Sequence, residues 1–472
     1  MKFSRKKITD IDTLVRYHEE LLFVRAYPPN AAVVREVERE LRGFANRVSA
    51  LKVDLAPLQH PEVSGIAGTS VTDTFSFYIV RWLLERHAPE VAIDWDWFED
   101  ENRLAETWPR FIPLLEEDTF VEANIPYREW LAAACKGRPE LPWLMDRFDS
   151  LPKSDKERAE LYDSQQIYVR WTPDYNASRT GMRLPARRLF YHRGPLIQRR
   201  EVDFTRELVQ PVTLRKVSEH EGKKALDMAR EASTIRYREL YGFTHGDPRH
   251  VYHVELGRGV ELFLMGLPPD KRLPLRVYHA AMIYKNGVPI GYFEGLSLFE
   301  RMESGFNLYY TFRDGETAWL YARTLNVMRQ FTGVTAFSLD PYQIGHENEE
   351  GIESGAFWFY RKLGFRPTNG DALQLALKEE EKIRTRKGYR TPASTLRRLA
   401  ASPMIFELDA KRRGDWDNFQ VRNIGFKAQR NKSVLSLMHK IAKAKQAAEE
   451  VTYLRLMQKD ENLRSAIIKL GS

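Results

Sequence analysis

The sequence "SGAFWFYRKLGFRP" (residues 354–367) carries the strongest structural signal in the chain. Its first ten residues have helical spacing, and their apolar face consists of Ala356, Phe357, Phe359, Tyr360 and Leu363. Gly364 stands where such a helix would end. A tyrosine on this face buries its ring together with a hydroxyl that needs a partner away from water. The segment is therefore either an ordinary amphipathic helix or a helix whose tyrosine points into a cleft as a proton donor.

Around this helix, residues 211–380 alternate strand and helix patterns. The expected elements, in chain order, are a strand at 211–218, a helix at 219–242, a hairpin at 250–268, strands at 275–287, 288–301 and 303–313, a helix at 314–333, a strand at 334–342, the helix at 354–363 and a final strand or helix at 372–380. Turn signals at Asn286-Gly287 and Ser304-Gly305 separate the middle strands. This order predicts an α/β domain with a mixed sheet flanked by helices.

The flanking regions have a different texture. Residues 1–205 carry mostly helical patterns, such as "AAVVREVERELRGFANRVSAL", and form a large, mostly helical N-terminal region. Residues 381–472 form a basic helical tail with 21 Lys or Arg against 9 Asp or Glu, a net charge of +12. Since the whole chain carries +8, the remainder is mildly acidic. The tail is therefore either a solvated helical face or a surface for nucleic acid or another acidic partner.

Length and composition bound the class of protein. A chain of 472 residues is too long for one ordinary core, so two or three domains are expected. The single cysteine, Cys135, excludes an internal disulfide and a site with several cysteine ligands, which fits a reducing compartment. The basic N-terminus meets Thr9, Asp10 and Asp12 instead of an apolar signal-peptide core. With no apolar run near the roughly 20 residues of a membrane span, we expect a cytoplasmic protein without membrane insertion.

Residues 211–380 resemble the GNAT acyltransferases, which use acetyl-CoA or another acyl-CoA to acylate an amine. The segment "FYRKLGF" carries the pattern Tyr-x-Lys-x-Gly-Phe, and Ala356 occupies the small position one turn before Tyr360. The segment "GVPIGYFEG" resembles the turn and strand that precede the cofactor strand of the family. The resemblance implies a GNAT-like fold and acyl transfer from acyl-CoA to an amine acceptor. The acceptor, a small molecule or a protein amine, stays open.

A cofactor loop can be placed by chemistry and by resemblance. CoA carries a pyrophosphate, for which free N–H groups at a helix N-terminus are a natural cradle, and Gly315 stands at such a junction. The predicted cofactor loop consists of Tyr310, Thr311, Phe312, Arg313, Asp314, Gly315, Glu316, Thr317 and Ala318. In the family a glycine usually stands where this chain has Glu316, and an asparagine where it has Glu353. A carboxylate beside a pyrophosphate is unfavourable unless it points away.

The resemblance also implies catalytic roles. Tyr360 would lie near the CoA sulfur and protonate the departing thiolate. A base must accept a proton from the ammonium of the acceptor, and Glu294 and Glu303 are the candidates, with Glu300 beside them. Deprotonation through water is equally open.

Three alternatives accompany this interpretation. The histidines of "HGDPRHVYH" have no standard metal-ligand spacing, so no metal site is predicted. Residues 1–205 could be a diverged second GNAT-like unit, although they contain no second Tyr-x-Lys-x-Gly-Phe pattern. The chain could also be a non-catalytic GNAT-like binding module whose basic tail docks on nucleic acid.

Overall fold

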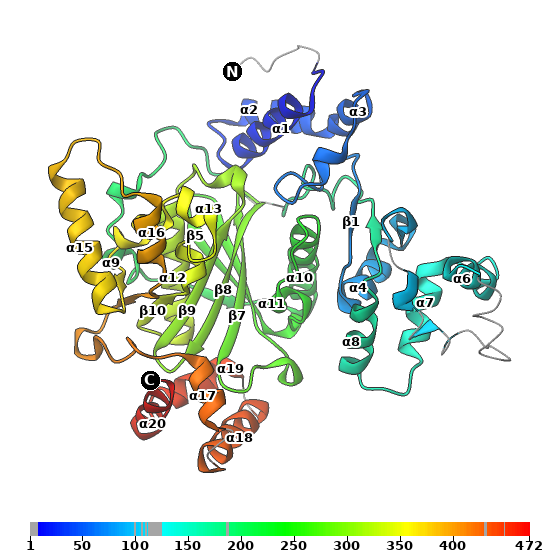
Figure 1. Cartoon of the computed structure of the whole chain (residues 1–472). Helices are drawn as coiled ribbons and strands as arrows, with labels where there is room; N and C mark the ends of the chain where they lie inside the picture. Colours follow the sequence, from blue (N-terminus) through cyan, green and yellow to red (C-terminus); the bar gives the residue numbers. More distant parts are fainter. Residues whose placement is uncertain are drawn as a thin grey trace. The chain divides into compact units, whose positions relative to one another are not determined.

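The computed structural model describes residues 8–98, 101–104, 107–108, 111, 125–185, 188–428, 432–447 and 449–472 (Figure 1). The chain divides into two compact units, which we call unit 1 and unit 2. Unit 1 comprises residues 1–185 and 227–240, and unit 2 comprises residues 186–226 and 241–472. Helix α10 (Glu219–Thr234) contributes residues to both.

Unit 1 is largely helical. Its longer helices are α1 (Ile11–Ala26), α2 (Ala31–Arg42), α3 (Phe44–Ser49), α4 (Phe77–His87), α6 (Tyr127–Cys135), α7 (Glu140–Asp149) and α8 (Asp155–Gln165). Three short strands, β1 (Val71–Asp73), β2 (Val91–Ile93) and β3 (Val169–Trp171), form an antiparallel sheet in the order β1-β3-β2. Fully buried aromatic side chains, among them Phe77, Phe148, Tyr162 and Trp171, fill the core of this unit.

The described residues of unit 2 form one nine-stranded sheet. The strands are β4 (Leu214–Lys216), β5 (Val251–Gly257), β6 (Val260–Met265), β7 (Val277–Lys285), β8 (Val288–Leu298), β9 (Arg301–Leu308), β10 (Ala336–Leu339), β11 (Arg366–Pro367) and β12 (Met404–Glu407). Their order is β11-β12-β10-β9-β8-β7-β6-β5-β4. The predicted α/β class, with a mixed sheet flanked by helices, is confirmed.

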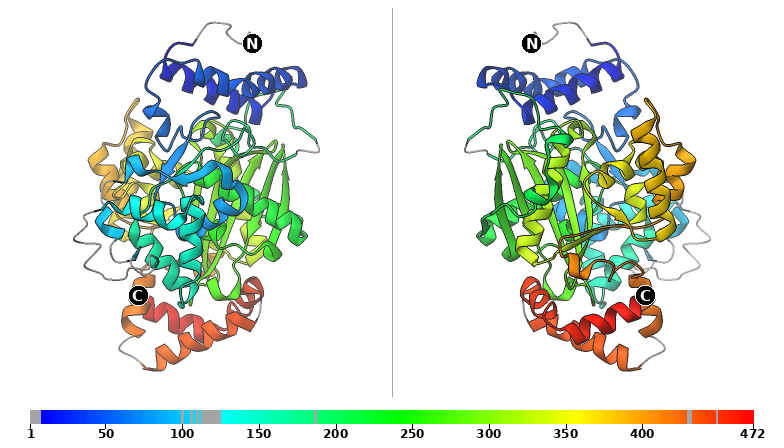
Figure 2. Two further views of the ribbon diagram at one scale, coloured as in Figure 1. Left: turned by 90° about the vertical axis from the view of Figure 1, so that its right-hand side faces the viewer. Right: turned by 90° about the vertical axis from the view of Figure 1, so that its left-hand side faces the viewer.

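The helices of unit 2 lie between and beyond these strands. They are α9 (Phe204–Glu207), α11 (Tyr241–Thr244), α12 (Thr317–Thr332), α13 (Glu349–Glu353), α14 (Ala356–Arg361), α15 (Gly370–Thr385), α16 (Ala393–Ala400), α17 (Val421–Ala428), α18 (Lys432–Ala447), α19 (Glu450–Met457) and α20 (Glu461–Gly471). The last four gather at one end of the strands (Figure 2). Among the described residues, no helix combines the length and the apolar character needed to cross a membrane.

One strand pair of the large sheet is parallel. Strands β9 and β10 pair in parallel and are joined by the crossover helix α12, whereas the other pairs of described strands in this sheet are antiparallel. The parallel ladder has three residue pairs, from Arg301/Ala336 to Glu303/Ser338. Strand β9 then continues to Leu308 paired with β8 alone. Beyond Glu303, the edge of β9 that faces β10 has no strand partner among the described residues.

The position of one predicted turn is wrong. Ser304 and Gly305 lie inside β9, and the two-residue turn between β8 and β9 is at Phe299-Glu300. A side chain on Gly305 would begin 3.3 Å from Nε2 of Gln343, so this glycine provides room for a neighbour. Phe299 makes the turn at a φ of 51°, although an aromatic residue gives no turn signal. The predicted turn at Asn286-Gly287 is confirmed, with positive φ at both residues.

Two helix predictions also need correction. Helix α10 ends at Thr234, eight residues before the expected Gly242, and the chain then passes through Tyr237 at a φ of 53°. The ambiguous segment 372–380 is helical, because Asn369 caps a helix there by accepting hydrogen bonds from two backbone N–H groups. The helix predicted at 354–363 is confirmed as α14, and Gly364 follows it at a φ of 102°.

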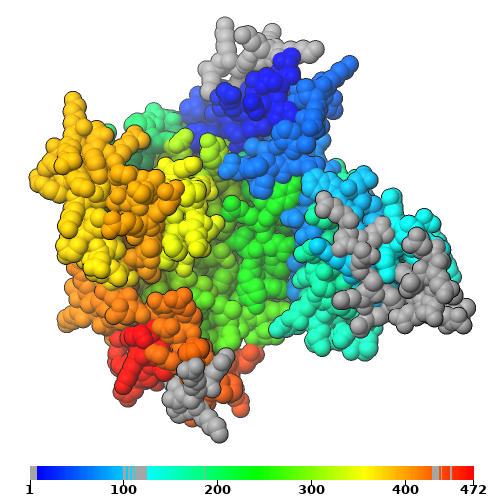
Figure 3. All heavy atoms as spheres, viewed as in Figure 1, coloured from blue at the N-terminus to red at the C-terminus, as the bar shows by residue number. Residues whose placement is uncertain are grey.

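The C-terminal segment is part of the sheet domain. Strand β12 inserts between β10 and β11, so residues beyond 380 complete the large sheet. The segment that follows β12 adjoins the strand region of the same unit on the face that Figure 3 shows, and α19 contacts β7. A buried ion pair holds α20 in place, with Nε of Arg464 2.9 Å from both carboxylate oxygens of Glu300. Trp416 donates to the same carboxylate at 2.8 Å.

Candidate active site

The predicted cofactor loop leads from β9 into the N-terminus of α12. A short 3₁₀ turn, Tyr310–Phe312, precedes it, and the N–H of Gly315 donates to the Phe312 carbonyl at 3.0 Å. The Thr317 hydroxyl donates to the Arg313 carbonyl at 2.7 Å. The backbone N–H groups of Thr317, Ala318 and Trp319 donate to no described residue, as expected for the first turn of a helix. Three donors at the positive end of α12 are therefore available to an anion.

The side chains of the loop divide into exposed and buried groups. Tyr310 is 63% exposed, and the Arg313 guanidinium lies over its ring and forms an ion pair with Glu350 of α13. Asp314 is exposed, and Thr311 and Thr317 are half-buried. Phe312 and Ala318 are buried and anchor the two ends of the loop. The loop thus presents Arg313 and Asp314 to solvent, and the buried Phe312 and Ala318 face the core.

Glu316 points into the protein. Its side chain is fully buried, and no side-chain hydrogen bond from it caps the helix. Nζ of Lys285 lies 3.2 Å from its carboxylate, the Arg258 guanidinium also donates to it, and the backbone N–H of Ile197 donates at 3.2 Å. Two cations therefore compensate the carboxylate, so Glu316 does not oppose an anion at the helix end.

The ionisation of this cluster follows from burial and proximity. Burial alone would raise the pKa of Glu316, but the Arg258 hydrogen bond and the Lys285 charge hold that pKa below its usual value. Burial lowers the pKa of Lys285 to about 8. Burial and the charge of Lys285 lower the pKa of His192 to about 4, so the imidazole is neutral at pH 7. Through Glu316, the cluster connects the N-terminus of α12 to Arg258 in the turn between β5 and β6 and to Lys285 at the end of β7.

Tyr360 lies on the α12 side of the sheet. Its ring packs edge-on against Tyr321 of α12, with centroids 5.4 Å apart, and against Phe365 at 5.8 Å. The residue is 6% exposed, and burial raises the pKa of its hydroxyl well above the usual value. No described residue forms a hydrogen bond with this hydroxyl. Because Tyr321 follows Thr317 by one helical turn, Tyr360 lies close to the cofactor loop.

The two candidate bases lie on the opposite face. Ser304 contacts the Tyr321 hydroxyl of α12 at 3.2 Å, and side chains alternate along a strand, so Glu303 points to the other face. Glu294 shares that face, because it lies directly across from Gly305 in the β8–β9 ladder. The sheet separates Tyr360 from the two glutamates. They can act on one bound molecule only where it lies in the opening between β9 and β10, beyond the last pair of that ladder.

Glu294 has the properties of a base. The Tyr278 hydroxyl donates to its carboxylate and itself accepts the N–H of Gly242 at 3.2 Å. Burial raises the pKa of Glu294, although the Tyr278 hydrogen bond opposes the shift. Glu303 differs, because Arg276 at 3.6 Å and Arg301 at 3.7 Å compensate its charge. Glu294 is therefore the better proton acceptor of the two.

Two groups of this face were not predicted. Tyr278 orients Glu294, and Gln343 lies over Gly305 with a buried amide oxygen that no described residue bonds. A Cβ atom placed on Gly305 would lie 3.3 Å from Nε2 of Gln343 and 3.8 Å from Cβ of Glu294. The side chains of Gln343 and Glu294 therefore flank the glycine. A glycine inside a strand, where backbone or ligand approaches closely, is the signal that could have located them.

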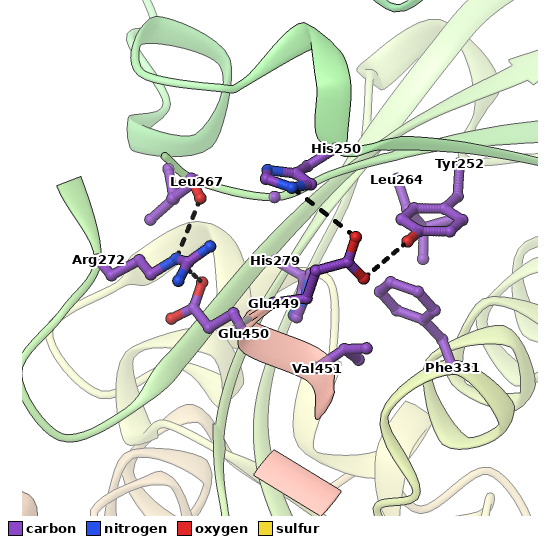
Figure 4. A pocket seen from close by; sticks show the side chains of 11 residues that line it. His250, Tyr252, Leu264, Leu267, Arg272, His279, Phe331, Glu449, Glu450 and Val451 are labelled. Atoms are coloured by element: carbon purple, nitrogen blue, oxygen red, sulfur yellow. Dashed lines mark hydrogen bonds and ion pairs between the residues drawn. The ribbon is translucent and has the colours of Figure 1, made fainter. Parts of the chain in front are cut away.

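The three histidines have separate environments. The His250 ring lies 3.2 Å from the Asp247 carboxylate and 3.9 Å from Glu449, the second of which Figure 4 shows. The His253 ring is 2.9 Å from Glu261. His245 packs against the ring of Tyr241. Arg272 points at Glu450, as Figure 4 shows. Nε of Arg272 and the Glu450 carboxylate are 3.9 Å apart. In the part of the chain that the structure describes, no group of three His, Cys, Asp or Glu could hold a metal ion.

The surroundings of Glu450 attach the C-terminal helices to the sheet. Lys445 is fully buried, donates to the Leu273 carbonyl at 2.7 Å and lies 3.6 Å from Glu450. Burial raises the pKa of Glu450 to about 7 and lowers that of Lys445 to about 8.

The chain matches no known protein-family model, no curated protein and no solved structure. A function for the candidate active site therefore has to be argued from its geometry.

Proposed function

We propose that unit 2 is an N-acyltransferase of the GNAT type, which transfers an acyl group, acetyl in the simplest case, from acyl-CoA to an amine. The observation that carries this proposal is the parting of β9 and β10 after three residue pairs, beside the N-terminus of their crossover helix. A strand edge with unpaired backbone groups can bind an amide-containing chain such as the pantetheine arm. The adjacent helix end supplies N–H donors for the pyrophosphate.

The charge distribution of the cofactor loop supports the same function. Glu316 is compensated by Lys285 and Arg258, and Arg313 stands at the loop surface. Glu316 stands where the family usually has a glycine. Because its charge is compensated, the N-terminus of α12 stays electropositive. Arg313 forms an ion pair with Glu350, and the same guanidinium would have to bind the phosphates. CoA binding therefore requires Arg313 to leave Glu350.

The residues on the two faces divide the proton transfers. Glu294 takes a proton from the ammonium of the acceptor, directly or through water, so that the amine nitrogen can attack the acyl carbonyl. A carbon–nitrogen bond forms and the carbon–sulfur bond breaks. As the tetrahedral intermediate collapses, the attacking nitrogen loses its second proton to solvent and the Tyr360 hydroxyl gives a proton to the departing thiolate. Tyr360 then regains a proton from solvent, and Glu294 releases its proton to solvent. Tyr278 positions the Glu294 carboxylate, and Gln343 offers an amide oxygen to the acceptor.

Two titrations and one assay test the proposal. Calorimetry should detect acetyl-CoA binding and much weaker binding of S-acetylpantetheine, which lacks the pyrophosphate. Thiol release with a panel of amines should then identify acceptors. Glu294→Gln should lower kcat by roughly 10²-fold, with partial recovery at high pH where the free amine is abundant, and should leave acetyl-CoA affinity unchanged.

Glu303→Gln is the matched control, because it removes a carboxylate from the same face. It should have a smaller effect, since arginines already compensate that charge. If millimolar acetyl-CoA gives neither heat nor a thermal shift, unit 2 is not an acyl-CoA enzyme. Binding without thiol release for any amine would favour a binding module over a transferase.

A further inference from the structure

Two arginines lie beside the candidate bases, on the same face of the large sheet. Nη1 of Arg276 is 3.6 Å from one oxygen of the Glu303 carboxylate, and Nη2 of Arg301 is 3.7 Å from the other. Arg301 begins β9, and Arg276 immediately precedes β7. We call Arg276 and Arg301 the arginine pair. Since Glu303 compensates one of the two positive charges, the other is left over.

The donors of the arginine pair are unused. Neither guanidinium forms a hydrogen bond with a described residue, and both separations from Glu303 exceed the roughly 2.7–2.9 Å of a charge-assisted hydrogen bond. Arg301 is only 8% exposed, and its Nε is buried without a partner. Its terminal nitrogens are not among the buried atoms that lack a partner, so they remain accessible. Buried guanidinium groups normally satisfy most of their N–H donors. Compensation of Glu303 alone therefore does not explain two arginines.

The arginine pair is both fixed in place and open to solvent. The Arg301 guanidinium lies 5.7 Å from the ring centroid of Trp416 and 5.3 Å from that of Phe419, and these cation–π contacts hold it. The side chains of Arg276 and Glu303 are each 25% exposed. An anion from solvent can therefore reach guanidinium groups whose positions are already set.

The strand register places the arginine pair at a defined distance from the proposed base. In the β8–β9 ladder Glu294 lies across from Gly305, and the next pair on the same face contains Glu303. Two residues along a strand span roughly 7 Å at ~3.3 Å per residue. Glu303 also belongs to the last pair of the parallel ladder, so Glu294 lies beside the opening and the arginine pair beside the ladder. One molecule on this face can therefore contact Glu294 with one end and the arginine pair with the other.

We propose that the amine acceptor also carries a carboxylate, roughly 7 Å from its amine, which the arginine pair binds while Glu294 takes the proton of the ammonium. This inference rests on the proposed acyl transfer and names the substrate class of the same site. The planar fork of a guanidinium matches the two oxygens of a carboxylate. A single negative charge also matches the one positive charge that Glu303 leaves over. A phosphate dianion would bring a second negative charge beside Glu303, which the arginine pair does not compensate.

Three acceptors of equal chain length test the proposal by thiol release from acetyl-CoA. They are 5-aminopentanoate, which spans the two subsites, pentylamine, which lacks the carboxylate, and 1,5-diaminopentane, which replaces it with a cation. The value of kcat/KM should be at least about tenfold higher for 5-aminopentanoate than for pentylamine, and lowest for the diamine. Equal or faster thiol release with pentylamine would overturn the proposal.

Variants of the charged group locate the carboxylate subsite. Arg276→Gln should lower the ratio of kcat/KM for 5-aminopentanoate to that for pentylamine by about tenfold. Glu303→Gln should raise this ratio, because it removes the competing carboxylate. Arg384→Gln, which removes an exposed arginine of α15 that is also paired with a glutamate, is the matched control and should keep the wild-type ratio. An unchanged ratio in Arg276→Gln, or a fall in both Arg276→Gln and Glu303→Gln, would refute the subsite.

A binding measurement separates this inference from acyl transfer itself. Calorimetry of the full chain should detect 5-aminopentanoate, with at least about tenfold weaker binding in Arg276→Gln. If no amine releases thiol but this binding is found, acyl transfer fails and the carboxylate subsite stands. If pentylamine and 5-aminopentanoate release thiol equally well, acyl transfer stands and the carboxylate subsite fails.

Discussion

The ring of Tyr360 is buried, and its hydroxyl has no hydrogen bond to a described residue. A phenylalanine would fill the same space between Tyr321 and Phe365 without this polar group. The hydroxyl is not one of the buried polar atoms that lack a partner, so solvent reaches it, and the same access would admit a ligand atom.

Tyr360→Phe tests that explanation. Because no protein partner loses a hydrogen bond, the melting temperature should stay the same or rise slightly. Acyl-CoA affinity should be kept, while turnover should fall on the order of 10²-fold, as for loss of a general acid. The measurement is kcat with an identified acceptor, beside a thermal melt. Full turnover by the variant would return Tyr360 to the core.

Glu316 shows where sequence reasoning lacks information. The sequence places a carboxylate beside the predicted phosphate site, and it cannot tell which way the side chain points. The answer depends on Lys285 and Arg258, which lie more than thirty residues back in the chain, at the end of β7 and in the turn between β5 and β6. Partners of buried charges are long-range, so local pattern cannot supply them.

Glu316→Gln should destabilise unit 2 by roughly 3–5 kcal/mol, because it leaves Lys285 buried without its counter-charge. Chemical denaturation of the full chain measures this loss. Glu350→Gln, which removes an exposed partner of Arg313, is the control and should change stability little. Equal stability of Glu316→Gln and wild type would mean that the buried cluster does not hold the loop.

Among the helices and strands, the sequence predicted those turns and helix ends whose conformation depends on the residues of the turn itself. Asn286-Gly287 is a turn because both residues tolerate a positive φ, and Gly364 ends α14 for the same reason. Gly305 was misread as a turn because its role is to admit Gln343, a contact made by a distant segment. The Phe299 ring is fully buried, and this burial holds the turn in place. Because no glycine, asparagine or proline marks the turn, the sequence around it does not reveal it.

The N-terminus of α12 permits a test of its donor N–H groups, with a thermal melt as the check that Glu316, at a ψ of 45°, accommodates a following proline. Proline is tolerated at the first helical position, where the N–H has no helical partner. Thr317→Pro should remove one phosphate donor and weaken acyl-CoA binding by about tenfold. Thr317→Ala removes only the hydroxyl and should bind nearly as well as wild type. Calorimetry of both variants decides: equal affinities would place the pyrophosphate elsewhere.

On the scale of the whole molecule, the C-terminal helices are part of the domain that carries the candidate active site. Glu300 joins Arg464 of α20 to Trp416 at the start of β9. Strand β9 spans eight residues, so this junction is about 25 Å from the cofactor loop at ~3.3 Å per residue. The tail can therefore stabilise the sheet without touching the loop.

The Glu300 junction predicts a pH dependence. Burial would raise the pKa of Glu300, but hydrogen bonds from Arg464 and Trp416 lower it. A lowered pKa contributes stability that is present above the unfolded value of about 4.3 and is lost as pH falls through the folded value. Glu300→Gln should lose about 1.5–3 kcal/mol at pH 7 and show a weaker decline in acid. Denaturation midpoints from pH 3 to 7 measure both effects, and parallel curves for the two proteins would contradict the assignment.

The basic tail predicts salt-sensitive retention on polyanions. Truncation cannot test this, because it would remove β12 from the sheet. Lys440 and Lys443 of α18 are exposed, and their replacement by Glu should lower the salt concentration that elutes the full chain from heparin. Lys156→Glu, 82% exposed on α8, is the control for net charge. Elution of both variants at the same salt concentration would assign no special role to the tail.

The insertion of β12 between β10 and β11 has a consequence for synthesis. Strand β10 leaves the ribosome before residues 340–403, which take several seconds to follow at roughly 5–20 residues per second. Until β12 arrives, β10 has an open edge that can pair with any other chain, and β11 has no strand to join. A message that stops shortly before Met404 would encode each residue of the candidate active site. Its product would nevertheless expose that edge permanently, and chaperones and proteases would meet it as an unfinished sheet.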